Sequence, residues 1–303
     1  TGRCCQHFSV IQAWCAVFIH SRMSDSEKFA LLVTALRESG ATIAELGVGD
    51  FQGYGRGLCA RVAQEAGAEL ARIPLKHCLT NRPEDAPKRL RPLLADAFGP
   101  GFGGGSLPLC VRLWSEWSSP SSPVFAAWLP LLRDCLTGEP PALCWDRAAA
   151  ERCGPLARVE GLLEVAEKQR AALFQQLGDL ARRFPDKLSK APEEQDVAWM
   201  HAVCTSRTLT LPCTDNDDSH TVVQVIAPVA DFVNHSFQQG PTPFVQLCSG
   251  ELVLRAVASV ALDGQVVGPY YGAAGNDDLF VDAGMAVSDN PYHSVELSLS
   301  TPS

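Results

Sequence analysis

The sequence predicts an α+β fold in which short strands at both ends of the chain flank a long run of helices. Three observations support this prediction. Apolar residues recur at helical spacing near the start and through the middle of the chain. β-Branched runs bounded by turn residues return after residue 199, and glycine or proline separates many of these segments. With 303 residues and 46% hydrophobic content, the chain has enough apolar material for a sizeable core.

The first predicted element is an amphipathic helix over residues 26–39. Ser24 or Ser26 suits its N-cap, and Gly40 should end it. Its apolar face comprises Phe29, Leu31, Leu32, Val33 and Leu36.

Short strands are expected next, around a glycine cluster at residues 53–57 that predicts a tight turn. Residues 59–74 alternate in polarity and break at Gly67. This pattern predicts a hairpin whose second strand ends at Pro74.

Helices should fill the middle of the chain. Helical periodicity covers residues 107–117, 124–136 and 156–184, and the glycine-rich stretch 99–105 predicts a flexible loop. Strand patterns then return at 222–229 and 244–260, with expected turns at 248–251 and 263–264.

Composition excludes several classes of protein. The formal net charge of -9 gives no support for binding to a nucleic-acid backbone. No apolar run is long enough to cross a bilayer. The twelve cysteines include no C-x-x-C pair, so we expect reduced, buried thiols and no metal site. We expect a monomeric intracellular protein, and the sequence leaves cytoplasm, nucleus and plastid open.

Two short motifs carry the functional information. An apolar run leads into Asp231-Phe-Val-Asn234-His235-Ser236, and Tyr270-Tyr271-Gly272 follows some thirty-five residues later. If these segments meet in space, an amide, an imidazole and a phenol form a polar cluster in an apolar pocket. That is the usual construction of a cofactor site.

The order of these motifs, after Gly53-Tyr-Gly-Arg-Gly-Leu-Cys-Ala60 and Ser206-Arg-Thr208, resembles that of the SET-domain protein methyltransferases. Within this family, the sequence most resembles the branch that contains the RuBisCO large-subunit lysine methyltransferase and the actin-histidine methyltransferase. The resemblance extends from about Glu27 to about Leu297. It implies a SET β-fold split by a helical insertion, with S-adenosylmethionine as the cofactor and a lysine-bearing protein as the substrate.

The resemblance also implies a division of the chain. Residues 1–22 form an N-terminal extension, 23–82 the first part of the SET domain and 83–202 the helical insertion. Residues 203–298 form the second part, with the cofactor and catalytic motifs, and 299–303 a tail. The helical C-terminal substrate-binding domain of such enzymes is expected to be missing.

Roles for individual residues follow from the same resemblance. It makes Tyr271 the catalytic residue and assigns Leu209 and Ala230 to the substrate channel. The implied cofactor contacts are Tyr54, Arg56, Arg207, Asp231, Asn234, His235, Tyr271, Ala283 and Met285.

The residues alone leave blander interpretations open. The glycine cluster could be a plain turn, and Arg207 could be a surface arginine that caps the carbonyls of a helix. The Asn-His pair could lie in a buried turn with its hydrogen bonds satisfied inside the protein. On a regular strand Tyr270 would point away from Tyr271.

Two departures from the family pattern bear on function. Ala283 replaces a tyrosine that helps to close the cofactor pocket of lysine-specific relatives, and Gly268-Pro269 interrupts the strand before the tyrosines. A catalytically silent SET fold that binds a protein partner is therefore one alternative to lysine N-methylation. Histidine N-methylation is the other, although small Ala230 and apolar Leu209 favour lysine.

Overall fold

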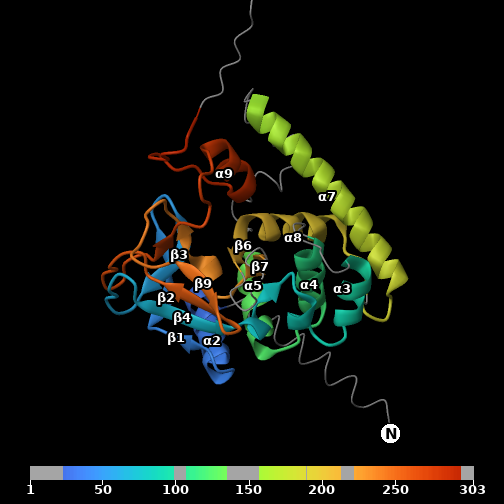
Figure 1. Cartoon of the computed structure of the whole chain (residues 1–303), viewed down its shortest axis with the longest axis horizontal. Helices are drawn as coiled ribbons and strands as arrows, with labels where there is room; N and C mark the ends of the chain where they lie inside the picture. Colours follow the sequence, from blue (N-terminus) through green and yellow to red (C-terminus); the bar gives the residue numbers. More distant parts are fainter. Residues whose placement is uncertain (1–22, 99–106, 135–156, 189, 213–221, 295–303) are drawn as a thin grey trace, which may run out of the picture.

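The computed structural model describes residues 23–98, 107–134, 157–188, 190–212 and 222–294. The expected N-terminal extension, the glycine-rich loop at 99–105 and the tail at 299–303 lie outside the described residues. Most strands gather on one side of the molecule, and helices α3, α4, α7 and α8 lie on the other (Figure 1).

The described residues form both α-helices and short 3-10 turns. The α-helices are α2 (Asp25–Glu38), α3 (Arg91–Phe98), α4 (Leu107–Ser118), α5 (Pro123–Asp134), α7 (Ala157–Arg183), α8 (Glu194–Arg207) and α9 (Asn276–Ala283). The 3-10 turns are η1 (Leu75–His77), η2 (Pro83–Asp85) and η4 (Ala230–Phe232).

The strands occupy both ends of the chain, as predicted. They are β1 (Thr42–Ile43), β2 (Leu46–Phe51), β3 (Gly55–Ala60), β4 (Glu69–Pro74), β5 (Leu79–Thr80), β6 (Leu209–Pro212), β7 (Val222–Ile226), β8 (Asn234–His235), β9 (Val245–Cys248), β10 (Glu251–Arg255) and β11 (Val267–Gly268).

Helix α2 begins and ends where its sequence requires. Ser24 is the N-cap, and it forms a reciprocal capping box with Glu27. Gly40 follows the helix with a φ of 97°, a conformation that favours glycine. The predicted apolar face is buried except for Leu31, which is 44% exposed.

The two ends of the chain build common sheets. Antiparallel β1, β4, β10 and β9 form one sheet, so that β4 from the N-terminal segment pairs directly with β10 from the C-terminal segment. In another sheet, β7 lies between β5 and β6. All the helices from α3 to α8 fall between these halves in sequence, which confirms the mixed fold.

The predicted hairpin over residues 59–74 is wrong. Strand β3 pairs with β2 instead, around a turn that contains Gly53 and Gly55 at positive φ. The connection between β3 and β4 is held by the C-terminal segment, because the Gln64 and Gly67 amides donate to the carbonyls of Val260 and Ala256. The alternation located two strands but did not reveal that β3 pairs with the preceding strand β2 and that β4 pairs with the distant strand β10.

The hairpin between β9 and β10 matches its prediction. Cys248 lies opposite Glu251, and the intervening Ser249 and Gly250 have φ values of 50° and 76°. Two consecutive positive φ values are typical of the tight turns that join antiparallel strands.

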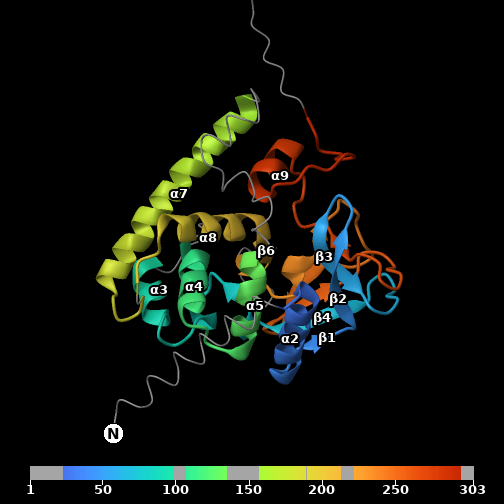
Figure 2. The same ribbon diagram turned by 180° about the vertical axis from the view of Figure 1, so that it is seen from behind.

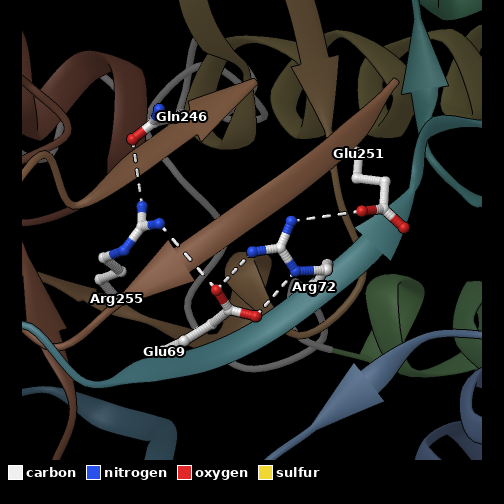
Figure 3. Close-up of polar contacts among 5 residues, drawn as sticks. All are labelled: Glu69, Arg72, Gln246, Glu251 and Arg255. Carbon is white, nitrogen blue, oxygen red and sulfur yellow. Dashed lines mark hydrogen bonds and ion pairs between the residues drawn. The ribbon is translucent and has the colours of Figure 1, made fainter. Parts of the chain in front are cut away.

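Polar side chains from β4, β9 and β10 form a network on one face of the four-stranded sheet (Figure 3). At its centre Val253 lies opposite Arg72 and Gln246 and is fully buried. Arg72 pairs with Glu69 at 2.6 Å and with Glu251 at 3.3 Å. The two arginines balance the two glutamates, and each pair, with its side chains about one third exposed, is worth at most about 1 kcal/mol.

Helix α5 lies between α4 and α2 (Figure 2) and packs closely against α2. Its Phe125 and Trp128 side chains are fully buried in a core that also includes residues from the strands. The core is therefore continuous from helix α5 to the sheets.

The cysteines in the described residues are free, and all except Cys248 are buried. Among the described helices, none combines the length and apolar character needed to cross a membrane.

Candidate functional site

A cavity of about 710 Å³ opens where the N-terminal and C-terminal segments meet. Its size lies within the range of small-molecule sites. Nearly all the residues expected at the site line it: Tyr54, Arg56, Arg207, Leu209, Ala230, Asp231, Asn234, His235, Ala283 and Met285. Tyr271, although it also belongs to the described residues, is not part of the lining.

A short parallel pairing brings the two central motifs together. Asn234 in β8 pairs with Val267 in β11, and His235 pairs with Gly268. Strand β11 ends before Pro269, and at Gly268 a Cβ atom would lie 2.3 Å from the Phe244 ring. Glycine is thus required at position 268, directly before the proline that ends the strand.

Tyr271 joins the Asn-His motif to the end of α8. Its hydroxyl donates to the Ser206 carbonyl at 2.9 Å, and its amide donates to His235 Nδ1 at 3.4 Å. Burial, with nearby Tyr270 and Asp282, raises the phenol pKa well above its usual value. The phenol is therefore neutral, and its one proton is donated to the Ser206 carbonyl.

The expectation that Tyr270 points away is wrong. Its ring lies 5.0 Å from the Tyr271 ring, and both rings contact the His235 ring at near-perpendicular angles. Strand alternation does not apply because β11 ends at Gly268. Tyr270 lines the cavity, and burial raises its pKa to about 12.

His235 is a neutral imidazole. Burial lowers its pKa to about 4, a hydrogen bond with the Gly268 backbone acts in the opposite direction, and Nδ1 accepts the Tyr271 amide proton at 3.4 Å. Nε2 is buried and has no hydrogen-bond partner among the described residues.

Asn234 approaches the glycine cluster unusually closely. Its Nδ2 donates to the Arg56 carbonyl at 3.4 Å, and a Cβ atom at Gly57 would lie only 2.4 Å from that nitrogen. Only glycine at position 57 leaves space for the amide.

Asp231 occupies the turn η4, which begins after Val229. Val229 has a φ of 69°, and this conformation is strained for a β-branched residue. The Asp231 carbonyl accepts from the Arg207 guanidinium, and its Oδ2 accepts from Trp128 Nε1 at 3.0 Å. Burial outweighs these neighbours and raises the pKa of Asp231 to about 6.

The Arg56 guanidinium is engaged in contacts with other protein groups. It pairs with Asp25 at 2.7 Å, donates to the Leu131 carbonyl at 2.9 Å and lies over the Phe232 ring at 5.2 Å. Tyr54, by contrast, is 50% exposed beside the cavity.

The residues after α9 form the remaining wall. Gly284 ends the helix with a φ of 69°, and Ala283 and Met285 border the cavity with small and flexible side chains. Leu209 and Ala230, expected in the substrate channel, line the same cavity.

Sequence reasoning missed Trp128, Tyr270 and Gly57 as contributors to the site. Gly57 and Tyr270 both lie within motifs that the sequence singled out, the glycine cluster and Tyr270-Tyr271-Gly272, whereas Trp128 has no such signal. Trp128 donates a hydrogen bond to Asp231, which lies 103 residues later in the sequence, and no local pattern connects the two residues.

Within the described residues, no group of three or more His, Cys, Asp or Glu side chains is arranged to hold a metal ion.

Solved structures with a similar fold are SET-domain enzymes. The SET domain of LSMT bound to lysine and AdoHcy aligns with a TM-score of 0.65 at 16% identity, over 88% of this chain and 59% of that one. The same domain bound to methyllysine and AdoHcy aligns at 0.64 and 16%, over 88% and 58%. Rubisco LSMT bound to AdoMet aligns at 0.63 and 14%, over 86% and 57%.

The chain therefore spans less than two thirds of the length of these chains. No protein-family model matches it, and no curated protein matches it either. The fold-class prediction is confirmed: the chain has the SET-domain fold of the Rubisco LSMT structures.

Proposed function

We propose that this chain is an S-adenosylmethionine-dependent protein methyltransferase that acts on lysine. The parallel pairing of β8 with β11 is the observation that carries the proposal. It sets the Asn-His pair beside Tyr271, whose hydroxyl reaches the Ser206 carbonyl next to Arg207. Similar structures hold AdoHcy or AdoMet, and two of them also hold lysine or methyllysine.

The residues present fit the proposed cofactor. The cavity offers a guanidinium from Arg207 for a carboxylate group and the Asn234 amide for polar hydrogen bonds. Asp231 Oδ1 is buried without a hydrogen-bond partner among the described residues, so an acceptor remains for a donor group of the ligand. Apolar walls from Phe232, Val233 and Met285 suit a largely apolar ring system.

When bound, the cofactor supplies a methyl group activated by a sulfonium. The chain must then align donor and acceptor and exclude water. Tyr271 and the Ser206 carbonyl provide a neutral phenol and a carbonyl oxygen at one point, which can orient an amine that carries a lone pair. An ammonium has no lone pair, and a desolvated channel lowers the pKa of a lysine toward the neutral form.

Lysine is favoured over histidine by the residues at the substrate channel. Small Ala230 and apolar Leu209 both line the cavity and present no side-chain hydrogen-bond partner for an imidazole. A narrow apolar channel suits the methylene stem of lysine.

One observation favours a second function, partner binding without catalysis. The Tyr271 side chain donates to Ser206 and does not line the cavity, whereas Tyr270 does. In that case the cavity would bind the cofactor but would not transfer its methyl group.

Transfer of labelled methyl groups to lysine-containing and histidine-containing peptide libraries, with mass spectrometry to locate the product, separates these functions. We expect methyllysine from the native chain, a loss of about a hundredfold or more in Tyr271→Phe, and near-native transfer in Tyr292→Phe. Tyr292 is a suitable control because its ring is 48% exposed and outside the cavity lining. Methylhistidine would reassign the substrate, and cofactor binding without transfer would establish the silent fold.

A further inference from the structure

One face of helix α5 contacts two separate walls of the cavity. Trp128 and Leu131 are three residues apart and therefore share a side of the helix. The Trp128 indole donates to Asp231 Oδ2 at 3.0 Å, and the Leu131 carbonyl accepts from Arg56 Nη2 at 2.9 Å. Asp231 and Arg56 both line the cavity.

These contacts extend to further elements of the site. The Asp231 carbonyl accepts from Arg207 at the end of α8, and the Arg56 guanidinium lies over Phe232, the next residue of η4. Arg56 also pairs with Asp25 at the start of α2. Helix α5 thus contacts Arg56 of the glycine cluster and Asp231 of η4 directly, and it connects to α8 through Asp231.

The bond from Trp128 is well protected. Trp128 is fully buried and Asp231 is 9% exposed, so water cannot readily replace either partner. Loss of the indole donor would leave the carboxylate with a second unsatisfied oxygen in a buried position.

We propose that helix α5 is a latch for the cavity, in which Trp128 is a positioning residue that holds the Asp231 turn, and through it Arg207, in the cofactor-binding arrangement. The proposal rests on the proposed function for the identity of the ligand. Trp128 itself does not line the cavity and acts through Asp231.

The charges around Asp231 give this latch a distinctive pH dependence. The groups that face the carboxyl are Arg207 from α8, Arg56 from β3, the Trp128 donor from α5 and the Tyr270 phenol. Both arginines and the indole favour the ionised carboxylate, which in turn attracts the arginines. Removal of the indole donor should therefore raise the pKa of Asp231, and ligand affinity should begin to fall at a higher pH.

The test compares Trp128→Phe with Trp114→Phe. Trp114 is a matched control, because it lies in α4 of the same helical insertion, is 6% exposed and donates its indole proton to the Lys190 carbonyl at 2.9 Å. Binding of S-adenosylhomocysteine is measured by calorimetry from about pH 5 to about pH 8. We expect Trp128→Phe to weaken binding about tenfold or more near neutral pH and to move the midpoint upward, with little change in Trp114→Phe.

A ligand-free measurement separates this proposal from the proposed function. In the ¹⁵N-labelled native chain, the Trp128 indole N–H resonance should shift with a midpoint near pH 6, and Asp231→Asn should abolish the shift. The Trp114 resonance should stay constant. If the native chain binds no S-adenosylhomocysteine but this resonance titrates, the ligand assignment fails and the contact between Trp128 and Asp231 stands.

The latch is overturned in either of two cases. One is equal affinity and an equal pH midpoint in both tryptophan variants. The other is a Trp128 resonance that does not respond to pH, and this result is available even if Trp128→Phe does not fold.

Discussion

Replacement of Asp231 by asparagine should change the pH dependence of stability in a defined direction. Burial raises the pKa of Asp231 from 3.8 to about 6 in the folded chain. The folded state therefore binds more protons than the unfolded state between these values. Stability from this group is fully present below the unfolded pKa and is lost as pH rises through the folded pKa.

The magnitude follows from the size of the shift. A difference of about 2 pKa units at about 1.4 kcal/mol each gives a loss of about 3 kcal/mol between about pH 3.5 and about pH 7. Asparagine has a similar shape and does not titrate. The stability of the native chain relative to Asp231→Asn should therefore fall by about 3 kcal/mol over this range.

The prediction is stated as a difference in unfolding free energy between the native chain and Asp231→Asn, because His235 changes stability with pH in the opposite direction. Its pKa is lowered to about 4, so its contribution is present at neutral pH and is lost as pH falls. Asp231 and His235 both titrate in the native chain. Of these two groups, only His235 remains in Asp231→Asn, so the contributions common to both proteins cancel in the difference.

Urea unfolding of both proteins across this pH range is the assay, with ligand absent. A stability difference that is constant with pH would refute the reasoning, because it would mean that Asp231 has an ordinary pKa in the folded chain. A difference that rises with pH would show that the arginines outweigh burial.

Other substitutions test other parts of the site. Tyr271→Phe should leave S-adenosylhomocysteine affinity nearly unchanged in a calorimetric titration, because the phenol is expected to act on the acceptor; a large loss would make it a cofactor ligand. Gly57→Ala places a Cβ atom 2.4 Å from Asn234 Nδ2 and should cost about 1–3 kcal/mol in urea unfolding, whereas Gly161→Ala meets no atom within 4 Å and should not destabilise. Ala283→Tyr should tighten binding if the wall has room for a ring; weaker binding with a lower melting temperature would show a wall already packed around alanine.

The sequence predicted the elements better than their pairing. Local signals located α2 from its cap and the turn between β9 and β10 from Ser249-Gly250, because both depend on neighbouring residues. One partner of β4 is β10, about 180 residues away, and no local pattern could identify this pairing.

The same division holds for the site. Nearly all the residues to which the motif order assigned a role line the cavity. The prediction failed for Tyr270, because strand alternation was applied beyond the end of a strand of two residues. It could not reveal Trp128, because a single tryptophan in an apolar helix resembles any other core residue until its indole partner is known.

Calorimetric titration of the purified native chain with S-adenosylhomocysteine, with a chelator present, tests the central claim most directly. We predict saturable binding at one site per chain without added metal, and a higher melting temperature in the presence of ligand, because a ligand that binds only the folded state stabilises it. An absence of both heat and thermal shift at about millimolar ligand would contradict the account. A ligand with a dissociation constant well below this concentration must raise the melting temperature of the folded chain measurably.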